Sequence, residues 1–348
     1  MSGSKINTYF AAGNGYEGFR SYFDNIFSPS EYTRIYVLKG GPGTGKSSLM
    51  KKTGTHFRDL GFHTESILCS SDPSSLDGVI INSETKKFAI LDGTSPHETD
   101  AKIPGAVDEI INLGDAWDKD KLKKHRERII EINDSKKLHY KNAYGFLKLA
   151  GNFVPRFNTQ NLRFSSCRCE ELVFSLLSDL PTKKRGRKSK IKLISSFGKT
   201  GYSTLDGAII SANKKIFVTG RHGSDTLFMN RLTVAAESRK IEYTLFPSPL
   251  SHDIVEAIYF EDSDTLVSTR IASENKIDTS GFADEIEVSN DIKYYEKLHD
   301  ELTLRAKEAF LLASSAHFEL EAIYTPTMDF DKINKIRDTV IREIEGDL

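Results

Sequence analysis

The segment Arg34-Ile-Tyr-Val-Leu-Lys39 is followed directly by Gly40-Gly-Pro-Gly-Thr-Gly-Lys46-Ser47. The first segment is apolar and rich in β-branched and aromatic residues, which is typical of a buried strand. The second fits the pattern G-x-x-x-x-G-K-[ST], and a helix is expected from Lys46 to about Leu60. A strand, a glycine-rich turn and a helix in this order predict a phosphate-binding loop. The glycines let successive N–H groups turn inward, and the helix contributes the positive end of its dipole.

The side chains of this loop have distinct chemical roles in the expected site. Lys46 would reach the β- and γ-phosphates of a nucleotide, and the Ser47 hydroxyl would coordinate Mg²⁺. The expected nucleotide contacts come from Gly40, Gly41, Pro42, Gly43, Thr44, Gly45, Lys46, Ser47 and Ser48. The expected ligands are therefore ATP, or another nucleoside triphosphate, and Mg²⁺.

An acidic residue should end a strand beside the loop, where it can hold the metal ion directly or through water. Asp92 ends the apolar run Phe88-Ala-Ile-Leu-Asp92 and fits this role. The next residues are Gly93-Thr-Ser-Pro-His97, so the adjacent second carboxylate of many motor ATPases is missing. Any base that orients an attacking water must come from elsewhere.

Two candidates for that base lie in the segment Cys69-Ser-Ser-Asp72-Pro-Ser-Ser-Leu-Asp77. This segment leaves an expected strand at His63–Cys69, on the edge where ligands sit in open α/β sheets. Asp72 or Asp77 could orient a water or an acceptor hydroxyl. Asp72 could equally form a turn with Pro73, which Asp77 would cap.

The second half of the chain repeats the first weakly and in the same order. Lys215-Ile-Phe-Val218 echoes Arg34-Ile-Tyr-Val37, and Glu242-Tyr-Thr-Leu245 matches Glu65-Ser-Ile-Leu68. Between them, Gly220-Arg-His-Gly-Ser-Asp225 lies where the glycine-rich loop lay. This order indicates an internal duplication. The sequence therefore predicts an α/β protein with two tandem P-loop NTPase-like parallel-sheet domains, the second with a degenerate loop.

The second loop lacks the side chains that would hold a nucleotide. In the alignment of the two halves, Gly45 becomes Asp225, Lys46 becomes Thr226, Ser47 becomes Leu227, and Arg270 stands at the place of Asp92. An aspartate in the loop would set negative charge against phosphate. We therefore expect the second domain to be structural or regulatory. The alternative is that Arg221, His222 or Arg270 reaches the first site as a trans-acting cation.

A basic run marks the expected domain boundary. Seven of the ten residues from 183 to 192 are Lys or Arg. We expect a P-loop NTPase domain at 1–181, a basic linker at 182–192 and a degenerate P-loop-like domain at 193–348. A solvated linker is favoured over a nucleic-acid-binding arm, because the whole chain carries a formal net charge of −1.

Composition excludes several other classes of protein. The chain has 348 residues, and no stretch approaches the ~18 apolar residues of a membrane span. Its three cysteines, Cys69, Cys167 and Cys169, form no CxxC pair, which argues against a disulfide framework or a zinc site. We expect a soluble, cytoplasmic protein without a membrane partner.

The quoted residues resemble a family of duplicated P-loop ATPases found mainly in Firmicutes-type bacteria, often labelled only as hypothetical ATPases or nucleotide kinases. The matching segments are Tyr9–Asn14, Lys39–Ser47, Cys69–Gly78, Leu91–His97, Pro104–Val107 and Asn112–Gly114. They cover most of the first half strongly and the second half weakly. In that family both halves usually carry a P-loop, and this chain departs from the pattern in its second half. The resemblance implies a P-loop NTPase fold, and it implies Asn14 and His97 as site candidates beside Asp72 and Asp77.

The function indicated by these patterns is Mg-dependent hydrolysis or transfer of a γ-phosphoryl group at the first domain. Transfer requires an acceptor, and Arg126 and Arg128 could then belong to a lid over the phosphates. One alternative is a nucleotide-dependent switch with little turnover and a protein partner. Another, less favoured, is a nucleic-acid-linked ATPase that uses the basic linker. The acceptor, the nucleotide base, the oligomeric state and the pathway are not encoded in any motif of this chain.

Overall fold

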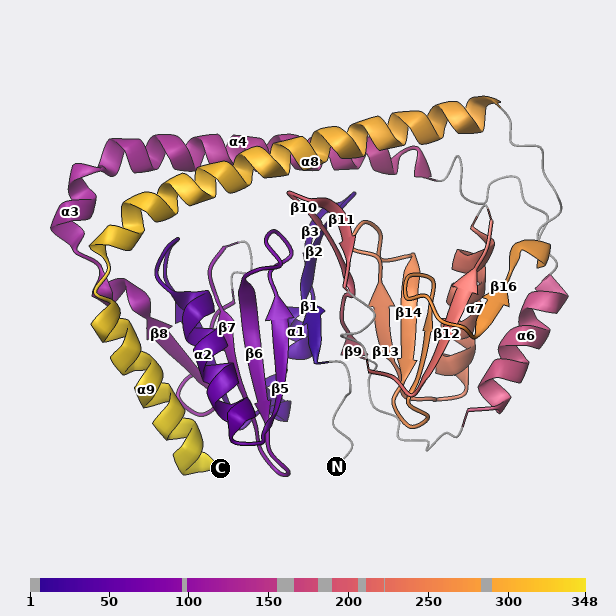
Figure 1. Cartoon of the computed structure of the whole chain (residues 1–348), viewed down its shortest axis with the longest axis horizontal. Helices are drawn as coiled ribbons and strands as arrows, with labels where there is room; N and C mark the ends of the chain where they lie inside the picture. The colour runs from indigo at the N-terminus through magenta and orange to yellow at the C-terminus, as the bar shows by residue number, and fades with distance from the viewer. Residues whose placement is uncertain are drawn as a thin grey trace.

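The protein consists of two six-stranded sheets that lie side by side and are spanned along one edge by two long helices (Figure 1). The computed structural model describes residues 7–95, 99–154, 166–180, 190–205, 211–221, 223–282 and 290–348. The spanning helices are α4 (Arg126–Gly151) and α8 (Asn290–Tyr324), which run antiparallel. No helix of the described ranges has the length and apolar character needed to cross a membrane.

The first sheet has the strand order β1-β5-β6-β7-β4-β8. Its strands are β1 (Thr8–Phe10), β4 (Arg34–Lys39), β5 (His63–Leu68), β6 (Leu76–Asn82), β7 (Lys87–Asp92) and β8 (Asp108–Asn112). The hairpin β2 (Ala12–Gly15) and β3 (Gly18–Ser21) stands apart from the sheet. Strand β4, next to the edge strand β8, is an apolar run whose four middle residues are buried, as expected of a strand between two parallel neighbours.

The second sheet has the order β9-β13-β14-β15-β12-β16, which is the order of the first sheet strand for strand. Its strands are β9 (Lys190–Ile191), β12 (Lys214–Thr219), β13 (Thr244–Pro247), β14 (Val255–Phe260), β15 (Thr265–Ser268) and β16 (Lys276–Asp278). A second hairpin, β10 (Ser195–Gly198) with β11 (Gly201–Thr204), matches β2–β3. Even the register shift of β5–β6, at Ile67/Leu68, recurs in β13–β14 at Phe246/Pro247. The predicted duplication is therefore confirmed, and we call β1–β8 with α4 the first repeat and β9–β16 with α8 the second.

The expectation of purely parallel sheets is wrong at β6 and at its counterpart β14. Both strands run antiparallel to both of their neighbours, and the other three pairings in each sheet are parallel. The connections explain this, because β6 and β7 are joined by only four residues, Ser83–Lys86. A parallel pair needs a crossover of a dozen residues or more.

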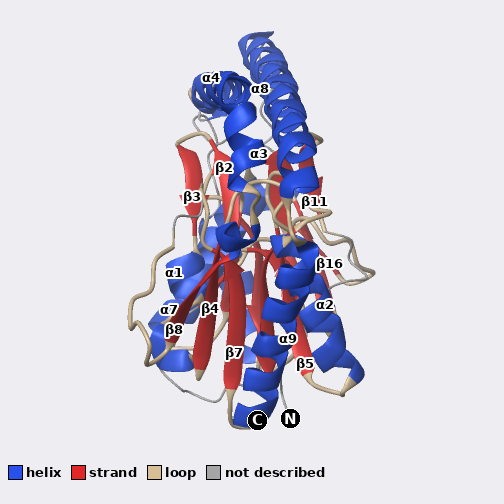
Figure 2. Ribbon diagram, turned by 90° about the vertical axis from the view of Figure 1, so that its left-hand side faces the viewer, coloured by secondary structure: helices blue, strands red, loops and turns tan. Residues whose placement is uncertain are grey.

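Helices cover the outer faces of the sheets (Figure 2). Helix α2 (Lys46–Asp59) follows β4, and α7 (Ser224–Ser238) follows β12 at the same place in the second repeat. The C-terminal helix α9 (Phe330–Asp347) returns to the first repeat and packs Ile333, Val340 and Ile344 into its core. The remaining helices are α1 (Phe23–Ile26), η1 (Pro29–Glu31), η2 (Leu113–Ala116), α3 (Lys119–Lys124), α6 (Ser166–Ser178), η3 (Ser280–Phe282) and η4 (Thr325–Thr327).

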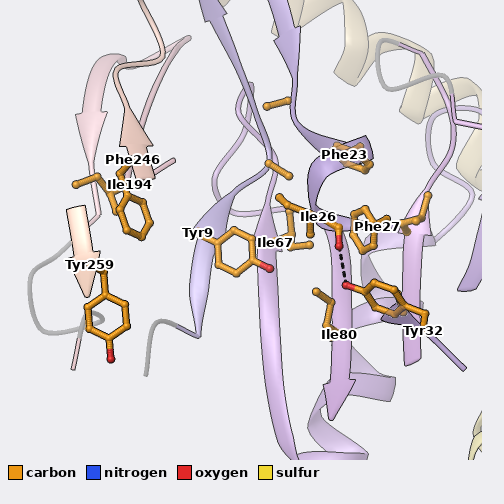
Figure 3. Close-up of a cluster of buried hydrophobic side chains, with 14 of the residues drawn as sticks. Tyr9, Phe23, Ile26, Phe27, Tyr32, Ile67, Ile80, Ile194, Phe246 and Tyr259 are labelled. Carbon is orange, nitrogen blue, oxygen red and sulfur yellow. Dashed lines mark hydrogen bonds between the residues drawn. The ribbon is translucent and has the colours of Figure 1, made fainter. Parts of the chain in front are cut away.

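A shared hydrophobic core joins the two repeats (Figure 3). Tyr9 and Ile67 of the first sheet belong to the same buried cluster as Ile194, Phe246 and Tyr259 of the second repeat. Removing these side chains from water stabilises the contact at about 25 cal/mol per Å² of apolar surface. The two repeats are therefore held in a fixed relation, and a site that draws side chains from both can be well ordered.

Candidate functional site

The loop Gly40–Ser47 lies between the end of β4 and the start of α2, as predicted. Gly43 (φ 67°) and Gly45 (φ 83°) adopt left-handed conformations, and Gly45 is the residue that precedes the first turn of α2. These conformations favour glycine over residues with a side chain. Together with neighbouring segments, the loop lines a cavity of about 690 Å³. A cavity of this size is within the range of sites for small ligands and cofactors.

Lys46 and Asp92 meet inside this cavity. Lys46 Nζ lies 3.6 Å from Asp92 Oδ2, and the two side chains are only 12% and 15% exposed. The same ammonium donates hydrogen bonds to the carbonyl oxygens of Gly40 (2.6 Å) and Gly41 (2.9 Å). Burial raises the pKa of the Asp92 carboxyl above its ordinary value, against the opposing effects of Lys46 and of hydrogen bonds from Thr94. The cavity thus holds a largely desolvated cation beside a carboxylate at the end of β7.

The oxygen donors at the first turn of α2 and at the end of β7 fit a hard divalent cation. Ser47 Oγ and the Asp92 carboxylate both line the cavity, and hydroxyl and carboxylate oxygens are ligands that Mg²⁺ prefers when substrate phosphates and waters complete the octahedron. Ser47 Oγ also accepts a hydrogen bond from the backbone N–H of Leu76 at 2.9 Å, which fixes its position. Within the described ranges, no group of three His, Cys, Asp or Glu side chains forms a protein-only metal site.

Asp72 and Asp77 both line the cavity, Asp72 from the loop between β5 and β6 and Asp77 from the start of β6. Asp72 Oδ1 accepts hydrogen bonds from Ser74 N (3.1 Å) and Ser74 Oγ (2.7 Å), so the expected turn is present as well. Its other oxygen lies 2.8 Å from Nζ of Lys199, a residue of the second repeat. Burial raises the pKa of Asp72, but the hydrogen bonds from Lys199 and Ser74 outweigh burial and hold it below its ordinary value. Asp77 is more deeply buried, at 6% exposed.

The far wall of the cavity comes from the two long helices and from the second hairpin. Its side chains are Lys136, Tyr140, Lys199, Phe310, Ser314, His317, Phe318 and Glu321. Sequence reasoning did not select these residues, because nothing local brings α4, α8 and the β10–β11 turn to the end of β4. The one available signal was the repeat of Gly15-Tyr-Glu-Gly18 as Gly198-Lys-Thr-Gly201.

Lys136 is a half-buried cation in this wall. Its Nζ lies 3.0 Å from His317 Nδ1. Burial and the nearby charge of Lys46 lower the pKa of Lys136. The charge of Glu321 opposes this lowering, so Lys136 and Lys46 together add positive charge to a cavity that also holds this carboxylate.

The C-terminal segment covers the glycine-rich loop. A Cβ atom on Gly43 would lie 2.5 Å from Thr325 Oγ1, and one on Gly45 would lie 3.5 Å from the ring of Phe330. The hydrogen bond with His317 lowers the pKa of Glu321, and the backbone N–H of Gly43 hydrogen-bonds to the same carboxylate. The loop is therefore in contact with the end of α8, η4 and the start of α9.

The equivalent loop of the second repeat is shorter than the sequence alignment assumed. Gly223 (φ 84°) precedes α7 as Gly45 precedes α2, so four residues (Gly220–Gly223) replace six (Gly40–Gly45). The counterparts of Lys46 and Ser47 are therefore Ser224 and Asp225, not Thr226 and Leu227.

Side chains of the second repeat fill the space at this loop. Ser224 Oγ accepts from Arg221 N (3.1 Å) and lies 2.9 Å from Thr279 Oγ1. A Cβ atom on Gly220 would be 2.4 Å from either hydroxyl. The two hydroxyl groups of Ser224 and Thr279 therefore occupy the space beside Gly220.

Strand register also corrects the counterpart of Asp92. The strands β4 (Arg34–Lys39) and β12 (Lys214–Thr219) match end to end, so Val37 corresponds to Phe217 and not to Val218. Leu91 pairs with Val37 and Ser268 pairs with Phe217, so Asp92 corresponds to Thr269 rather than Arg270. Arg270 Nε instead lies 3.3 Å from the buried carboxylate of Glu256, inside the second repeat. Arg221 and Arg270 are not among the residues that line the cavity, and His222 lies outside the described residues.

Other expected residues have structural roles or lie elsewhere. Asn14 is fully buried, donates to Phe197 O (2.8 Å) and accepts from Tyr144 Oη (2.8 Å), so it fixes the two hairpins to α4. Arg128 pairs with Glu131 and Glu319 on the surface, and Arg126 is exposed. His97 falls outside the described residues.

The expected linker at 182–192 lies mostly outside the described ranges. Its last residues, however, belong to the folded core, because Lys190–Ile191 form β9 and Lys192 is buried against Glu65. Lys192 is therefore not exposed for contact with a polyanion.

Cys69 and Cys169 are free thiols.

Comparison with protein-family models, with curated proteins and with solved structures gives no significant match. The resemblance to duplicated P-loop ATPases therefore stays a prediction that depends on the quoted motifs.

Proposed function

We propose that the first repeat binds a Mg²⁺-complexed nucleoside triphosphate, of which ATP is the expected one, and that it hydrolyses or transfers the terminal phosphoryl group. The observation that carries this proposal is the meeting of Lys46 and Asp92, 3.6 Å apart, beneath a glycine-rich loop in a cavity of about 690 Å³. A cation, a carboxylate and a glycine-rich loop before a helix are the groups that phosphoryl transfer needs, because its catalysis is mainly positioning and charge stabilisation.

The residues of the chain would act as follows. Lys46 would exchange the carbonyl oxygens of Gly40 and Gly41 for phosphate oxygens, which are charged and therefore stronger acceptors. Ser47 and Asp92 would hold Mg²⁺, which when bound neutralises charge on the β- and γ-phosphates. Asp72 and Asp77 stand at the edge of the same cavity, where a carboxylate can orient the attacking hydroxyl or water.

A nucleotide-dependent switch with little turnover is the second candidate. The contact of Gly43 and Gly45 with Thr325 and Phe330 favours it, because a change at the loop would be felt directly by η4 and α9. A switch needs an element with two arrangements that the ligand stabilises to different degrees. Turnover measurements separate the two candidates.

The test is release of phosphate and ADP from Mg-ATP by the purified protein. Lys46→Ala is compared with Lys52→Ala, which removes an exposed lysine from the same helix outside the cavity. We expect release by the wild type and by Lys52→Ala, and none by Lys46→Ala. Binding of ATP without release, lost in Lys46→Ala, would support the switch or a transferase that lacks its acceptor. Equal behaviour of wild type and Lys46→Ala would refute the proposed site.

A further inference from the structure

We propose that Lys199, which the second repeat delivers into the site of the first, is the cation that contacts the terminal phosphate of the bound nucleotide. The inference rests on the proposed function and assigns a role to the second repeat within it. Lys199 lies in the turn of the β10–β11 hairpin, far in sequence from the glycine-rich loop, and it lines the same cavity as Lys46.

The hairpin turn holds Lys199 in place through close backbone contact with the first repeat. A Cβ atom on Gly198 would lie 3.0 Å from the carbonyl oxygen of Ser70, so a larger residue would require the backbone of the first repeat to shift. Lys199 Nζ then lies 2.8 Å from Asp72 Oδ2 and 5.1 Å from the ring centroid of Phe318. The side chain is 21% exposed, so it is directed into the cavity rather than into solvent.

The contact of a hairpin with the opposite repeat occurs twice in this duplicated chain. The first-repeat hairpin reaches the second repeat in the same way, since Tyr16 N donates to Leu250 O at 2.9 Å. A Cβ atom on Gly15 would lie 2.5 Å from Pro249 O. Its counterpart Gly198 approaches the backbone of Ser70 in the same way. At the position equivalent to Lys199 the first hairpin carries Tyr16, whose hydroxyl lies 2.8 Å from His299 Nε2.

The two hairpin turns therefore differ in charge: one carries a lysine and the other a tyrosine. The loops of the repeats that they contact differ as well. The lysine points to the repeat that keeps Lys46, Ser47 and Asp92. The tyrosine points to the repeat in which Ser224 and Thr279 fill the loop. A purely structural crossing would not require a cation on one side only.

The chemistry of an ammonium group suits a role shared between Asp72 and a phosphate. An ammonium has three N–H donors, so Lys199 can keep its bond to Asp72 while it donates to a phosphate oxygen. Asp72 then acts as a positioning residue that orients Lys199. Lys136, whose Nζ lies 3.0 Å from His317 Nδ1, adds a second positive charge to the same wall. A terminal phosphate would face Lys46 from the loop and these two cations from the opposite wall.

The alternative is that the Lys199–Asp72 pair only fastens the two repeats together. That reading predicts a loss of thermal stability when the pair is broken, and an equal effect on all nucleotides. Contact with the terminal phosphate predicts a selective effect, because ADP lacks the phosphate that Lys199 would touch.

The experiment measures the dissociation constants of Mg-ATP and Mg-ADP for the full chain by calorimetric titration. Lys199→Met keeps the aliphatic stem against Phe318 and removes the charge, and Lys199→Arg restores the charge. Thr200→Ala, at the exposed neighbouring position of the same turn, is the matched control. Thermal unfolding without nucleotide checks that each variant is folded.

We expect Lys199→Met to weaken ATP binding by about tenfold or more, the usual effect of losing a charge-assisted hydrogen bond, and to leave ADP binding within about twofold. Lys199→Arg should recover most of the ATP affinity, and Thr200→Ala should match the wild type. Equal changes for ATP and ADP, or no change in either, would overturn the role of Lys199 while leaving the proposed function intact. Failure of the wild type to bind either nucleotide would overturn the proposed function itself.

Discussion

Replacing Glu65 with glutamine removes the carboxylate of a buried ion pair that ties the two repeats together. Lys192 Nζ lies 3.0 Å from Glu65 Oε2, and the two side chains are 5% and 9% exposed. Tyr9 Oη donates to the same oxygen at 2.8 Å, and Lys192 Nζ also lies 3.9 Å from the centre of the Tyr9 ring. Lys192 stands three residues before the hairpin that carries Lys199, so this pair anchors the crossing segment.

The pKa of Glu65 gives the free energy by which its ionised carboxylate stabilises the folded state. Burial alone would raise this pKa, but the charges of Lys192 and Lys87 and the hydrogen bonds from Lys192 and Tyr9 outweigh burial and lower it from 4.5 to about 2. The difference corresponds to about 3 kcal/mol of stability, at about 1.4 kcal/mol for each pH unit. Because the pKa is lower in the folded state, this stabilisation is complete above about pH 4.5 and is lost as the pH falls towards 2.

The assay is urea denaturation of the full chain at a series of pH values between 7 and 2, followed by far-UV circular dichroism and by the fluorescence of the single tryptophan, Trp117. At pH 7 we expect Glu65→Gln to lose about 3–5 kcal/mol of unfolding free energy, because Lys192 stays buried without its partner. Lys190→Met breaks a half-exposed pair between Lys190 of β9 and Glu31 of η1, and it should cost at most about 1 kcal/mol.

Two further comparisons make the prediction sharp. Adding Lys192→Met to Glu65→Gln should recover part of the loss, because the unpaired buried charge is then removed. The wild type should lose about 3 kcal/mol more than Glu65→Gln as the pH falls from 4.5 to 2. Identical acid sensitivity of the two proteins would refute the reasoning, whatever the loss at pH 7.

Two other predictions concern carboxylates at equivalent edges of the two sheets. Asp92→Asn should lower Mg²⁺-dependent turnover by about 100-fold or more, while nucleotide binding without Mg²⁺ persists. Turnover and titration assays with and without EDTA measure both effects. Unchanged turnover would exclude Asp92 as a metal ligand. Burial raises the pKa of Glu256 to about 7. The unfolding free energy should therefore fall as the pH rises from about 4.5 to 7, by about 2–3 kcal/mol more in the wild type than in Glu256→Gln. Urea titrations measure this difference. An equal dependence on pH in the two proteins would show that Glu256 is not its cause.

The glycine-rich loop and Asp92 could be predicted because their signal is local. A strand, a turn and a helix that are contiguous in sequence fix the positions of Lys46 and Ser47, and the apolar run before Asp92 indicates its place at a strand end. The antiparallel direction of β6 was also within reach, since four residues cannot form a parallel crossover. The expectation of parallel strands gave the βαβ pattern too much weight against this short connection.

The far wall of the site could not be predicted, because it depends on contacts between distant parts of the chain. Lys199 enters only because the hairpins exchange between repeats, and Glu321 enters because α8 spans both sheets before the chain returns through α9. The sequence suggested Arg221, His222 or Arg270 as a cation that reaches the first site from the second repeat. The geometry instead brings a hairpin turn to the cavity.

The alignment of the two loops failed by two residues for a related reason. Glycine spacing alone placed Asp225 opposite Gly45, whereas the start of each helix places Gly223 there. A helix start is fixed by backbone conformation, and the left-handed Gly223 (φ 84°) marks it more reliably than residue identity does.

The exchange of hairpins explains why one loop of a duplicated protein can degenerate while its repeat is retained. The first site takes its loop from β4 and α2, but its far wall needs α8 and the β10–β11 turn of the second repeat. Substitutions in the Gly220–Gly223 loop leave those elements in place, because Ser224 and Thr279 stabilise the shortened turn. Substitutions in the turn around Lys199 would open the first site directly. The proposed site of the first repeat therefore depends on the crossing hairpin and not on the second loop, and the difference between Lys199 and Tyr16 agrees with the proposal that the first repeat binds the nucleotide.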